Sequence, residues 1–244
     1  GRVRGGRRLA REVLCRLPFE GPYTHEHGVP ARYVGHPLVD DIARDGLLDH
    51  RIPRVAGKIA LLPGSRSMEI RHLLPTMVHA VERLDPGAVS EAVLVEAPGM
   101  GRIVDAVLAE IGGGEHIRRV SGPDRRVELA SSVLAWTASG TATLECALLD
   151  VPMVVGYRLQ PLSFAVAKAL VRVPHVALVN LIAGERAVPE LIQGDWNSDR
   201  LAAMSRDLLA GESEPQLAAL ARVRQRLGPP GASLQAAEAV LEYV

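Results

Sequence analysis

Ser-Gly-Thr-Ala-Thr-Leu-Glu, residues 139–145, connects two apolar runs at residues 133–136 and 152–157. Small residues after a buried strand predict a tight turn into a helix, so the pattern indicates strand, turn, helix and strand. The first backbone N–H groups of such a helix have no partner inside it, and a phosphate can accept hydrogen bonds from them. Glu145 follows about one helical turn later. The stretch therefore predicts a turn suited to a diphosphate that is flanked by ribose hydroxyls.

A second turn of the same kind lies upstream, after the apolar residues 58–62. Pro-Gly-Ser at residues 63–65 ends this predicted strand. Apolar residues then recur at helical spacing, at Ile70, Leu73, Leu74, Met77, Val78, Val81 and Leu84. Arg66 lies at the start of that helix, where its planar guanidinium can bind two phosphate oxygens at once. Because proline is tolerated in the first turn of a helix, we expect a short turn and then a main helix that begins at Pro75.

Each turn has a plain structural alternative, an efficient connection from strand to helix. Two such turns, one with an arginine and the other with a glutamate, favour a ligand site. From about residue 55 to residue 210, predicted strands alternate with helices, which is typical of a parallel sheet with helices on both faces. Ligands of open α/β sheets bind where the carboxyl ends of the strands meet, and we expect both turns to open at that edge.

Several short motifs follow one another along the chain. They are Leu-Pro-Phe-Glu at 17–20, Val-Gly-His-Pro-Leu at 34–38, Leu-Pro-Gly-Ser-Arg at 62–66 with Glu69, Ala-Ser-Gly-Thr-Ala-Thr-Leu-Glu at 138–145, Pro-Met-Val-Val-Gly-Tyr-Arg at 152–158, and Asn-Leu at 180–181 with Pro-Glu-Leu-Ile-Gln at 189–193. In order and spacing, this series resembles the lipid A disaccharide synthase family from about Arg7 onward. The family usually has proline at the position of Val179, so the loop before Asn180 is expected to differ locally.

The resemblance implies the GT-B type of α/β fold, in which the enzyme has two doubly wound lobes. This chain is expected to hold the second, Rossmann-like lobe and a remnant of the first. Residues 1–50 would form the end of the amino-terminal lobe and the connection between the lobes, with short strands at 13–15 and 32–34. Residues 51–212 would form the nucleotide-sugar-binding lobe, and residues 213–244 helices that return toward the first lobe. The rest of the amino-terminal lobe is expected to be missing from these 244 residues.

The resemblance also implies a reaction. The family transfers a sugar from UDP-2,3-diacylglucosamine to 2,3-diacylglucosamine 1-phosphate, with inversion at the donor carbon and release of UDP. A single displacement requires a base on the acceptor hydroxyl and charge stabilisation on the departing diphosphate. Arg66 is the expected stabiliser of the leaving group, whereas the general base is unassigned and expected in the missing lobe. Neither a metal nor another cofactor is implied.

Matching the motifs assigns the remaining substrate contacts residue by residue. The diphosphate is assigned to Arg66 and to the two turns that contain Gly64, Ser65, Ser139, Gly140 and Thr141. Glu145 is assigned to ribose or sugar hydroxyls, and Asn180 to the nucleotide or the donor sugar. Tyr157 and Gln193 are expected to line the cleft.

Two other interpretations stay open. Another enzyme that uses a UDP-sugar, such as a transferase of peptidoglycan precursor assembly or a sugar epimerase, would share the two turns but lacks the motifs at 17–20 and 34–38. A non-catalytic UDP-binding half-domain is the third interpretation. His36 likewise either fixes the turn at 34–37 by hydrogen bonding to the backbone or lines the cleft. We favour the structural role, because no partner in the sequence would tune its imidazole as a base.

The composition argues against other classes of function. The chain has 28 Lys and Arg against 28 Asp and Glu, so it lacks the basic footprint of a general nucleic-acid-binding protein. Cys15 and Cys146 are expected to be small buried side chains, and the scattered histidines predict no structural metal. The most apolar stretch, residues 164–179, is interrupted by charged residues and a proline, and is shorter than the roughly 18 apolar residues of a membrane helix.

Composition also bears on location. No secretory signal is recognised, so a cytoplasmic protein is expected. Six arginines within residues 1–16 could contact anionic headgroups on the cytoplasmic face of the inner membrane, although such a run is more often a solvated face. Residues 162–170 could meet acyl chains, but packing on the sheet is favoured. A homo-oligomer stays open.

Overall fold

A six-stranded, all-parallel sheet organises the larger part of the chain, of which the computed structural model describes residues 10–50, 52–160 and 174–243. In spatial order, its strands are β5 (Arg118–Val120), β4 (Glu91–Val95), β3 (Lys58–Leu62), β6 (Leu134–Ala138), β7 (Met153–Tyr157) and β8 (Glu190–Ile192). The chain moves outward from β3 to β5, returns to the centre at β6 and moves outward again to β8. This order is doubly wound, and its direction reverses between β3 and β6.

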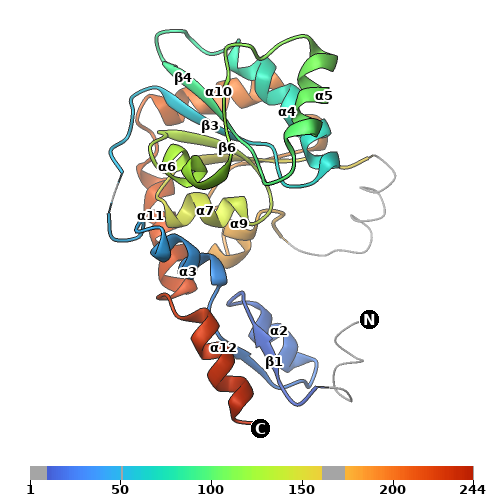
Figure 1. The fold of residues 1–244 in the computed structure, drawn as a ribbon, viewed down its shortest axis with the longest axis vertical. Coiled ribbons are helices and arrows are strands. Elements are labelled where there is room, and N and C mark those ends of the chain that lie inside the picture. Colours follow the sequence, from blue (N-terminus) through green and yellow to red (C-terminus); the bar gives the residue numbers. More distant parts are fainter. Residues whose placement is uncertain (1–9, 51, 161–173, 244) are drawn as a thin grey trace.

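Helices cover both faces of this sheet (Figure 1). One face packs against α4 (Ser67–Val81), α5 (Gly101–Ile111) and α10 (Ser198–Leu209). The other packs against α6 (Arg125–Ala130), α7 (Ala142–Leu148), α9 (Leu178–Ala183) and α11 (Glu214–Leu227). In β3, Ile59 and Leu61 join the first core, whereas Ala60 and Leu62 join the second, because successive side chains point to opposite faces. A strand buried on both faces is apolar throughout, which explains its sequence.

Helix α4 runs without interruption from Ser67 to Val81, with Pro75 inside it. Our prediction that the helix restarts at Pro75 is therefore wrong. A proline inside a helix costs about 3 kcal/mol, because it removes one backbone hydrogen bond and crowds the preceding turn. Burial of each large apolar side chain gives back about 1.5–3 kcal/mol. The face of α4 buries five such side chains around the proline, so packing keeps the helix continuous: Ile70, Leu73, Leu74, Met77 and Val78.

Helices form the carboxyl end of the chain, including the predicted segment 213–244. Asn197 precedes α10, and its side chain accepts a hydrogen bond from the N–H of Arg200 at 3.0 Å. Pro215 lies in the first turn of α11, where its missing N–H costs nothing. The last described helix, α12 (Ala232–Leu241), follows the break at residues 228–231.

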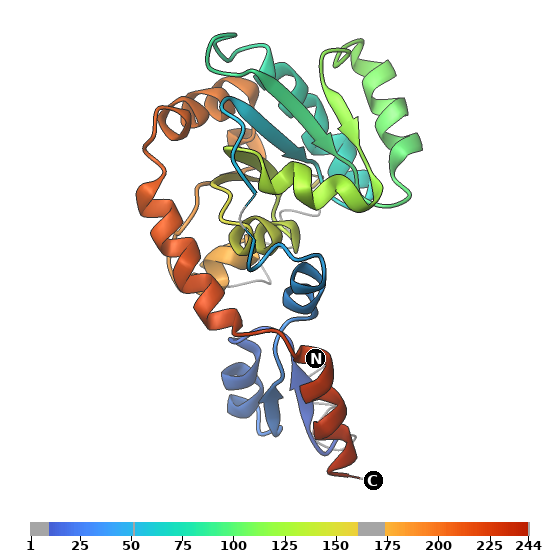
Figure 2. The ribbon, with the colours of Figure 1, turned by 60° about the vertical axis from the view of Figure 1, so that its left-hand side comes forward.

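A smaller unit lies at one end of the molecule (Figures 1 and 2). Its strands β1 (Val13–Cys15) and β2 (Ala31–Tyr33) pair in parallel, and α2 (Glu20–Glu26) connects them. The two predicted strands are confirmed to within one residue, and they pair with each other. Helix α12 runs beside this unit (Figure 2), and Arg32 of β2 forms two hydrogen bonds to Glu242, at 2.6 and 2.7 Å.

The two units divide the chain differently from the predicted segments. Helix α3 (Pro37–Arg44) lies before the predicted boundary at residue 50, yet it buries Val39 and Ile42 in a core of the large lobe. Helix α11 lies in the predicted terminal segment, yet Leu220 belongs to the same core. Helix α12 of that segment packs on the small unit, which α11 contacts at its last residue, where the carbonyl of Leu227 accepts from Tyr33 Oη at 2.8 Å. The predicted segments 1–50 and 213–244 each divide between the two units, because each helix packs where its apolar face is covered.

Smaller predictions concern the two cysteines, membrane-spanning helices, metal sites and two surface stretches. Cys15 and Cys146 are 2% and 0% exposed, which confirms that both are buried. No helix among the described residues is long and apolar enough to cross a membrane. Within the described ranges, no group of three or more His, Cys, Asp or Glu side chains is arranged to hold a metal ion. The arginines at positions 2, 4, 7 and 8 and the stretch 162–170 lie outside the described residues.

His36 caps α3, which confirms the structural role that we favoured. Its Nδ1 accepts a hydrogen bond from the N–H of Leu38 at 3.1 Å, so this nitrogen must carry no proton. Burial and, next, the positive charge of Arg16 lower the pKa of His36. A lowered pKa in the folded state means that the unfolded chain binds more protons as the pH falls from about 6.5, the value for free histidine. The contribution of His36 to stability is therefore present above that pH and is lost as the pH falls through the folded-state pKa.

We predict that His36→Asn makes stability less dependent on pH. An asparagine oxygen accepts the same bond at any pH, so the variant should gain stability relative to the wild type between pH 7.5 and 5.5. Urea unfolding at both pH values measures this gain. His50→Asn, which alters an exposed loop histidine, is the matched control and should keep the wild-type pH dependence. A parallel pH dependence in all three proteins would contradict the capping role.

Asp40 of α3 holds the start of α12. Its Oδ1 accepts hydrogen bonds from the N–H groups of Gly231 and Ala232, at 2.5 and 3.2 Å, and its Oδ2 accepts one from Ser233 at 3.1 Å. Burial favours a higher pKa for Asp40, but the three backbone bonds outweigh it and lower the pKa. One carboxylate of the large lobe therefore satisfies the free end of the helix that lies on the small unit.

We predict that Asp40→Ala loosens α12 from the large lobe. Loss of a helix cap costs about 1–2 kcal/mol, and three donors lose their acceptor here. Hydrogen exchange of the α12 amides should accelerate, and the midpoint of thermal unfolding should fall. Asp49→Ala, at an exposed position nearby in the sequence, should change neither. Unchanged exchange in Asp40→Ala would show that α12 is held by its other contacts.

Candidate functional site

The turns after β3 and β6 meet at the edge of the sheet where the strand direction reverses. Leu62 of β3 pairs with Thr137 of β6, so the two strands end side by side. A cavity of about 280 Å³ opens between their turns. It is lined by residues that follow β3, β4 and β6, together with residues of α6 and α7: Gly64, Ser65, Arg66, Glu69, Ala97, Pro98, Arg125, Gly140, Thr141, Ala142 and Glu145 among them. We call it the central cavity. Its position is the usual ligand position of an open α/β sheet.

The turn after β3 brings an arginine to this cavity. Gly64 has a φ of +115°, a conformation that residues with a side chain rarely adopt. Arg66 precedes the first turn of α4, and its side chain is 79% exposed. Its Nη1 donates to Glu69 Oε1 at 2.7 Å, and the N–H of Ser65 donates to Glu69 Oε2 at 3.0 Å. The arginine thus stands at the mouth of the cavity in contact with a carboxylate.

The turn after β6 presents backbone to the same cavity. A Cβ atom placed on Gly140 would meet nothing within 4 Å, so the space above this residue is open. Thr143 Oγ1 donates to the carbonyl of Gly140 at 2.9 Å and accepts from the N–H of Val179 at 3.3 Å. Valine at position 179 supplies this N–H, which a proline would lack. Among the described residues, the N–H groups of Gly140 and Thr141 have no hydrogen-bond acceptor.

Glu145 is buried at the floor of the central cavity, with 5% exposure. Arg125 Nη2 and Arg126 Nε both donate to its Oε1, at 2.7 and 2.8 Å. Burial disfavours the charge on Arg126, but its bonds to Glu145 and Asp45 outweigh this and raise its pKa. Within the described chain, no hydrogen bond reaches Glu145 Oε2. The carboxylate is thus fixed on one oxygen while the other is open to a hydroxyl donor.

Arg125 and Arg126 were not among the site residues predicted from the sequence. Both lie at the start of α6, after the short turn of residues 122–124 that follows β5. Because β5 has three residues and two of them are arginines, no apolar run marked it as a strand. A better signal was the Gly-Pro-Asp turn at 122–124, which is followed by two arginines at a helix start.

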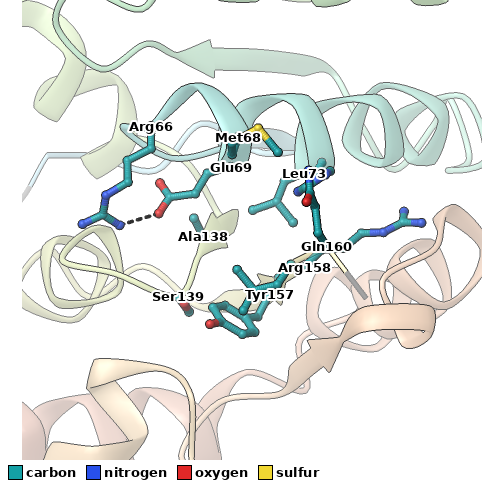
Figure 3. A pocket seen from close by; sticks show the side chains of 12 residues that line it. Arg66, Met68, Glu69, Leu73, Ala138, Ser139, Tyr157, Arg158 and Gln160 are labelled. Atoms are coloured by element: carbon teal, nitrogen blue, oxygen red, sulfur yellow. Dashed lines mark hydrogen bonds and ion pairs between the residues drawn. The ribbon is translucent and has the colours of Figure 1, made fainter. Parts of the chain in front are cut away.

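Tyr157 and Ser139 line a second cavity, of about 440 Å³, beside the first (Figure 3). Arg66 and Glu69 line both cavities and therefore form part of the wall between them. Figure 3 shows their ion pair on one side of the second cavity, and Tyr157 and Ser139 on the opposite side. Burial and, to a smaller extent, the charge of Glu69 raise the pKa of Tyr157, so its hydroxyl remains a hydrogen-bond donor at neutral pH.

Asn180 is fully buried and lines neither cavity. Its Nδ2 donates to Val188 O at 3.0 Å and to Glu190 Oε1 at 2.9 Å, and its Oδ1 accepts from the N–H of Val188 at 2.9 Å. Glu190 in turn accepts from the N–H of Ala177 at 2.9 Å, just before α9. The predicted direct contact of Asn180 with the nucleotide or sugar does not fit this arrangement, because both ends of its amide are used inside the protein. We reassign Asn180 to positioning α9 against β8.

Gln193 lies at the end of β8 and has a φ of +55°. Its Oε1 accepts from the N–H of Leu159 at 2.7 Å, and its Nε2 donates to Leu159 O at 3.1 Å. This pair of bonds holds the segment after β7 in place. Gln193 also lines a cavity of about 320 Å³ that shares His72, Arg158 and Leu159 with the second cavity. Its main contact is therefore to the backbone that shapes the cleft.

Comparison with known proteins identifies the family. The family model of the lipid-A-disaccharide synthetases matches residues 4–237. Lipid-A-disaccharide synthases of Anaeromyxobacter sp. (strain K) and Myxococcus xanthus are each 42% identical to the chain, over 99% and 100% of its length. The chain belongs to this family. It spans 64% and 65% of the length of these two relatives.

Solved structures confirm the fold class. A putative UDP-N-acetylglucosamine 2-epimerase of Listeria monocytogenes has a TM-score of 0.61 and 16% identity, over 96% of this chain and 60% of that one. The UDP-GlcNAc 2-epimerase of Methanocaldococcus jannaschii, solved in complex with UDP-GlcNAc and UDP, has a TM-score of 0.60 and 12% identity, over 97% of this chain and 62% of that one. The expected α/β fold of GT-B type, with a doubly wound lobe, is thus confirmed.

We predict that Glu145→Gln destabilises the fold. Two largely buried guanidinium groups would lose a charged acceptor, which costs about 2 kcal/mol or more in the free energy of unfolding. Urea unfolding measures this loss. Glu185→Gln is the matched control, because Glu185 pairs with Arg222 at 2.5 Å but both side chains are about half exposed, at 54% and 53%. The control should change stability by less than about 0.5 kcal/mol. Equal losses in the two variants would contradict the anchoring role of Glu145.

Proposed function

We propose that this chain supplies the nucleotide-sugar-binding lobe of a lipid A disaccharide synthase. The proposed enzyme transfers a sugar from UDP-2,3-diacylglucosamine to 2,3-diacylglucosamine 1-phosphate with inversion and releases UDP. The observation that carries this proposal is the central cavity, where Arg66 and the open turn at Gly140 and Thr141 face each other in a member of that family. The Methanocaldococcus structure of the same fold, solved with UDP-GlcNAc and UDP, supports a UDP ligand.

The diphosphate is proposed to lie in the central cavity. Arg66 supplies positive charge at its mouth, and the turns at Gly64 to Arg66 and at Ser139 to Thr141 supply backbone N–H groups. In an inverting displacement, negative charge develops on the diphosphate as the sugar leaves, and donors already aimed at it lower the barrier. Arg66 is therefore the proposed stabiliser of the leaving group. Since arginine supplies the countercharge, we propose that the reaction requires neither a metal nor another cofactor.

The nucleoside and the sugar are proposed to extend to opposite sides of the diphosphate. Glu145 lies on the α6 side of the central cavity. Among the described residues, no group donates a hydrogen bond to its Oε2, so this oxygen can accept one from a ribose hydroxyl. The second cavity lies on the β7 side, and Tyr157 and Ser139 there suit the hydroxyls of the donor sugar. Gln193 would act by holding the backbone of Leu159 beside this cavity.

A UDP-sugar epimerase is the second candidate, because both solved structures named above are described as such. Their sequence identity to this chain is 16% and 12%, against 42% for the synthases. A non-catalytic UDP-binding role is the third. Because the substrates of the proposed reaction carry acyl chains, we also propose that the enzyme works in the cytoplasm, in peripheral contact with the inner membrane surface.

We predict that Arg66→Ala weakens UDP binding by about 1.5–3 kcal/mol, or about 10- to 150-fold in Kd, as for other charge-assisted hydrogen bonds. Isothermal titration calorimetry of the 244-residue chain measures it. Arg71→Ala is the matched control, because Arg71 lies on the same helix, is 44% exposed, and pairs with Glu110 of α5 at 3.8 Å. The control should bind UDP as the wild type does. Equal affinity in the wild type and Arg66→Ala would overturn the assignment of the diphosphate site.

Two further measurements separate the candidate functions. A thermal-shift series with UDP, UDP-GlcNAc, GDP and NAD distinguishes a UDP lobe from a general dinucleotide domain, because only the uridine ligands should raise the melting temperature. Mass spectrometry of the products formed from both acylated glucosamines distinguishes a synthase from an epimerase. This assay is run on the 244 residues alone and after fusion to the remaining amino-terminal part of a complete relative. Disaccharide that forms only with the fusion would support a nucleotide-binding role for this lobe.

A further inference from the structure

We propose that Glu69 is a built-in competitor of the diphosphate. In the free lobe, its carboxylate occupies donors that the diphosphate takes over on binding, so the two anions exchange. This inference deepens the proposed function and rests on it. It predicts that removal of the negative charge at position 69 strengthens diphosphate binding, although Glu69 itself lines the binding site.

The contacts of Glu69 coincide with those assigned to the diphosphate. Oε2 accepts from the N–H of Ser65 at 3.0 Å, and Oε1 accepts from Arg66 Nη1 at 2.7 Å (Figure 3). A backbone N–H and a guanidinium are the donors that proteins use to bind phosphate oxygens. Each oxygen of this carboxylate thus holds one donor of a phosphate-binding pair.

The turn is shaped to admit this carboxylate. A Cβ atom on Gly64 would lie 2.4 Å from Glu69 Oε2 and 2.7 Å from Glu69 Cβ, which no side chain could tolerate. The contact also differs from an ordinary capping box, in which a glutamate at the third helical position bonds the N–H of the capping residue, here Arg66. Glu69 bonds the N–H one residue earlier and the side chain of Arg66. It therefore holds the turn and the arginine together.

Repulsion between the Glu69 carboxylate and the diphosphate favours exchange of the two anions when the ligand binds. A carboxylate and a diphosphate within reach of the same guanidinium repel each other, so they cannot share its donors without a cost. Glu69 is 30% exposed and Arg66 is 79% exposed, so neither side chain is locked by packing. Glu69 also lines the second cavity, where its charge already acts on Tyr157. Rotation of the carboxylate toward that cavity would free both donors for the diphosphate.

Calorimetry with ligands of increasing phosphate charge tests the exchange. The 244-residue chain is titrated with uridine, UMP, UDP and inorganic pyrophosphate, as wild type, Glu69→Gln and Glu69→Ala. Glutamine keeps an oxygen for the N–H of Ser65 but carries no charge, so the turn should stay folded. Glu110→Gln of α5, 73% exposed and paired with Arg71 at 3.8 Å, is the control for an equal change in net charge.

We expect Glu69→Gln to bind UDP and pyrophosphate about tenfold more tightly than the wild type, with a smaller gain for UMP and none for uridine. The gain should shrink at high salt, where exposed charges are screened. Glu110→Gln should bind all four ligands as the wild type does. Glu69→Ala should also gain affinity for UDP if its melting temperature shows that it is folded.

Two results would overturn the inference while leaving the proposed function intact. UDP binding by Glu69→Gln that equals or is weaker than that of the wild type would show that Glu69 only orders the turn and Arg66. A gain for uridine as large as that for UDP would place the effect away from the phosphates. By contrast, absence of UDP binding to the wild type, or equal binding by Arg66→Ala, would overturn the proposed function itself and this inference with it.

Discussion

The parallel pairing of β3 with β6 is the constraint on which the rest of the lobe depends. It places the carboxyl ends of both strands at one edge, with Leu62 opposite Thr137. Each strand is buried on both faces. The chain leaves each strand at that edge and turns into a helix. The reversal of strand order at this pair spreads the following helices to opposite faces and leaves the central cavity between the two turns.

Charged side chains at this cavity form two clusters, one of two residues and one of three. Arg66 contacts Glu69 near the surface, and Arg125 with Arg126 contacts Glu145 below it. The two clusters differ in burial, and burial decides what each can do. The exposed pair is worth little to stability and can open for a ligand, whereas the buried carboxylate holds two guanidinium groups that would be left without their charged acceptor. The same ion-pair chemistry thus provides a movable contact at the mouth and a fixed one at the floor.

Some polar side chains shape the site although they do not line its cavities. Asn180 joins α9 to the segment before β8, and Glu190 extends that link to the backbone before α9. Asp40 does the same between α3 and α12, across the two units of the molecule. In each case, a polar side chain satisfies backbone groups of another segment. A residue that belongs to a family motif can therefore position the backbone and need not contact a ligand.

The sequence by itself determined the strands β3, β6 and β7, the helices that follow β3 and β6, and the two small-residue turns, because these depend on the apolar pattern of neighbouring residues. It also placed Arg66 and Glu145 at one edge, since parallel strands share that edge. Only the tertiary structure decided the rest. The continuity of α4 through Pro75 depends on how well its face is buried, and Arg125 and Arg126 enter the site because β5 and α6 fold against β4 and α7. The inward-turned amide of Asn180 depends on Val188 and Glu190, whose positions relative to α9 no local pattern encodes.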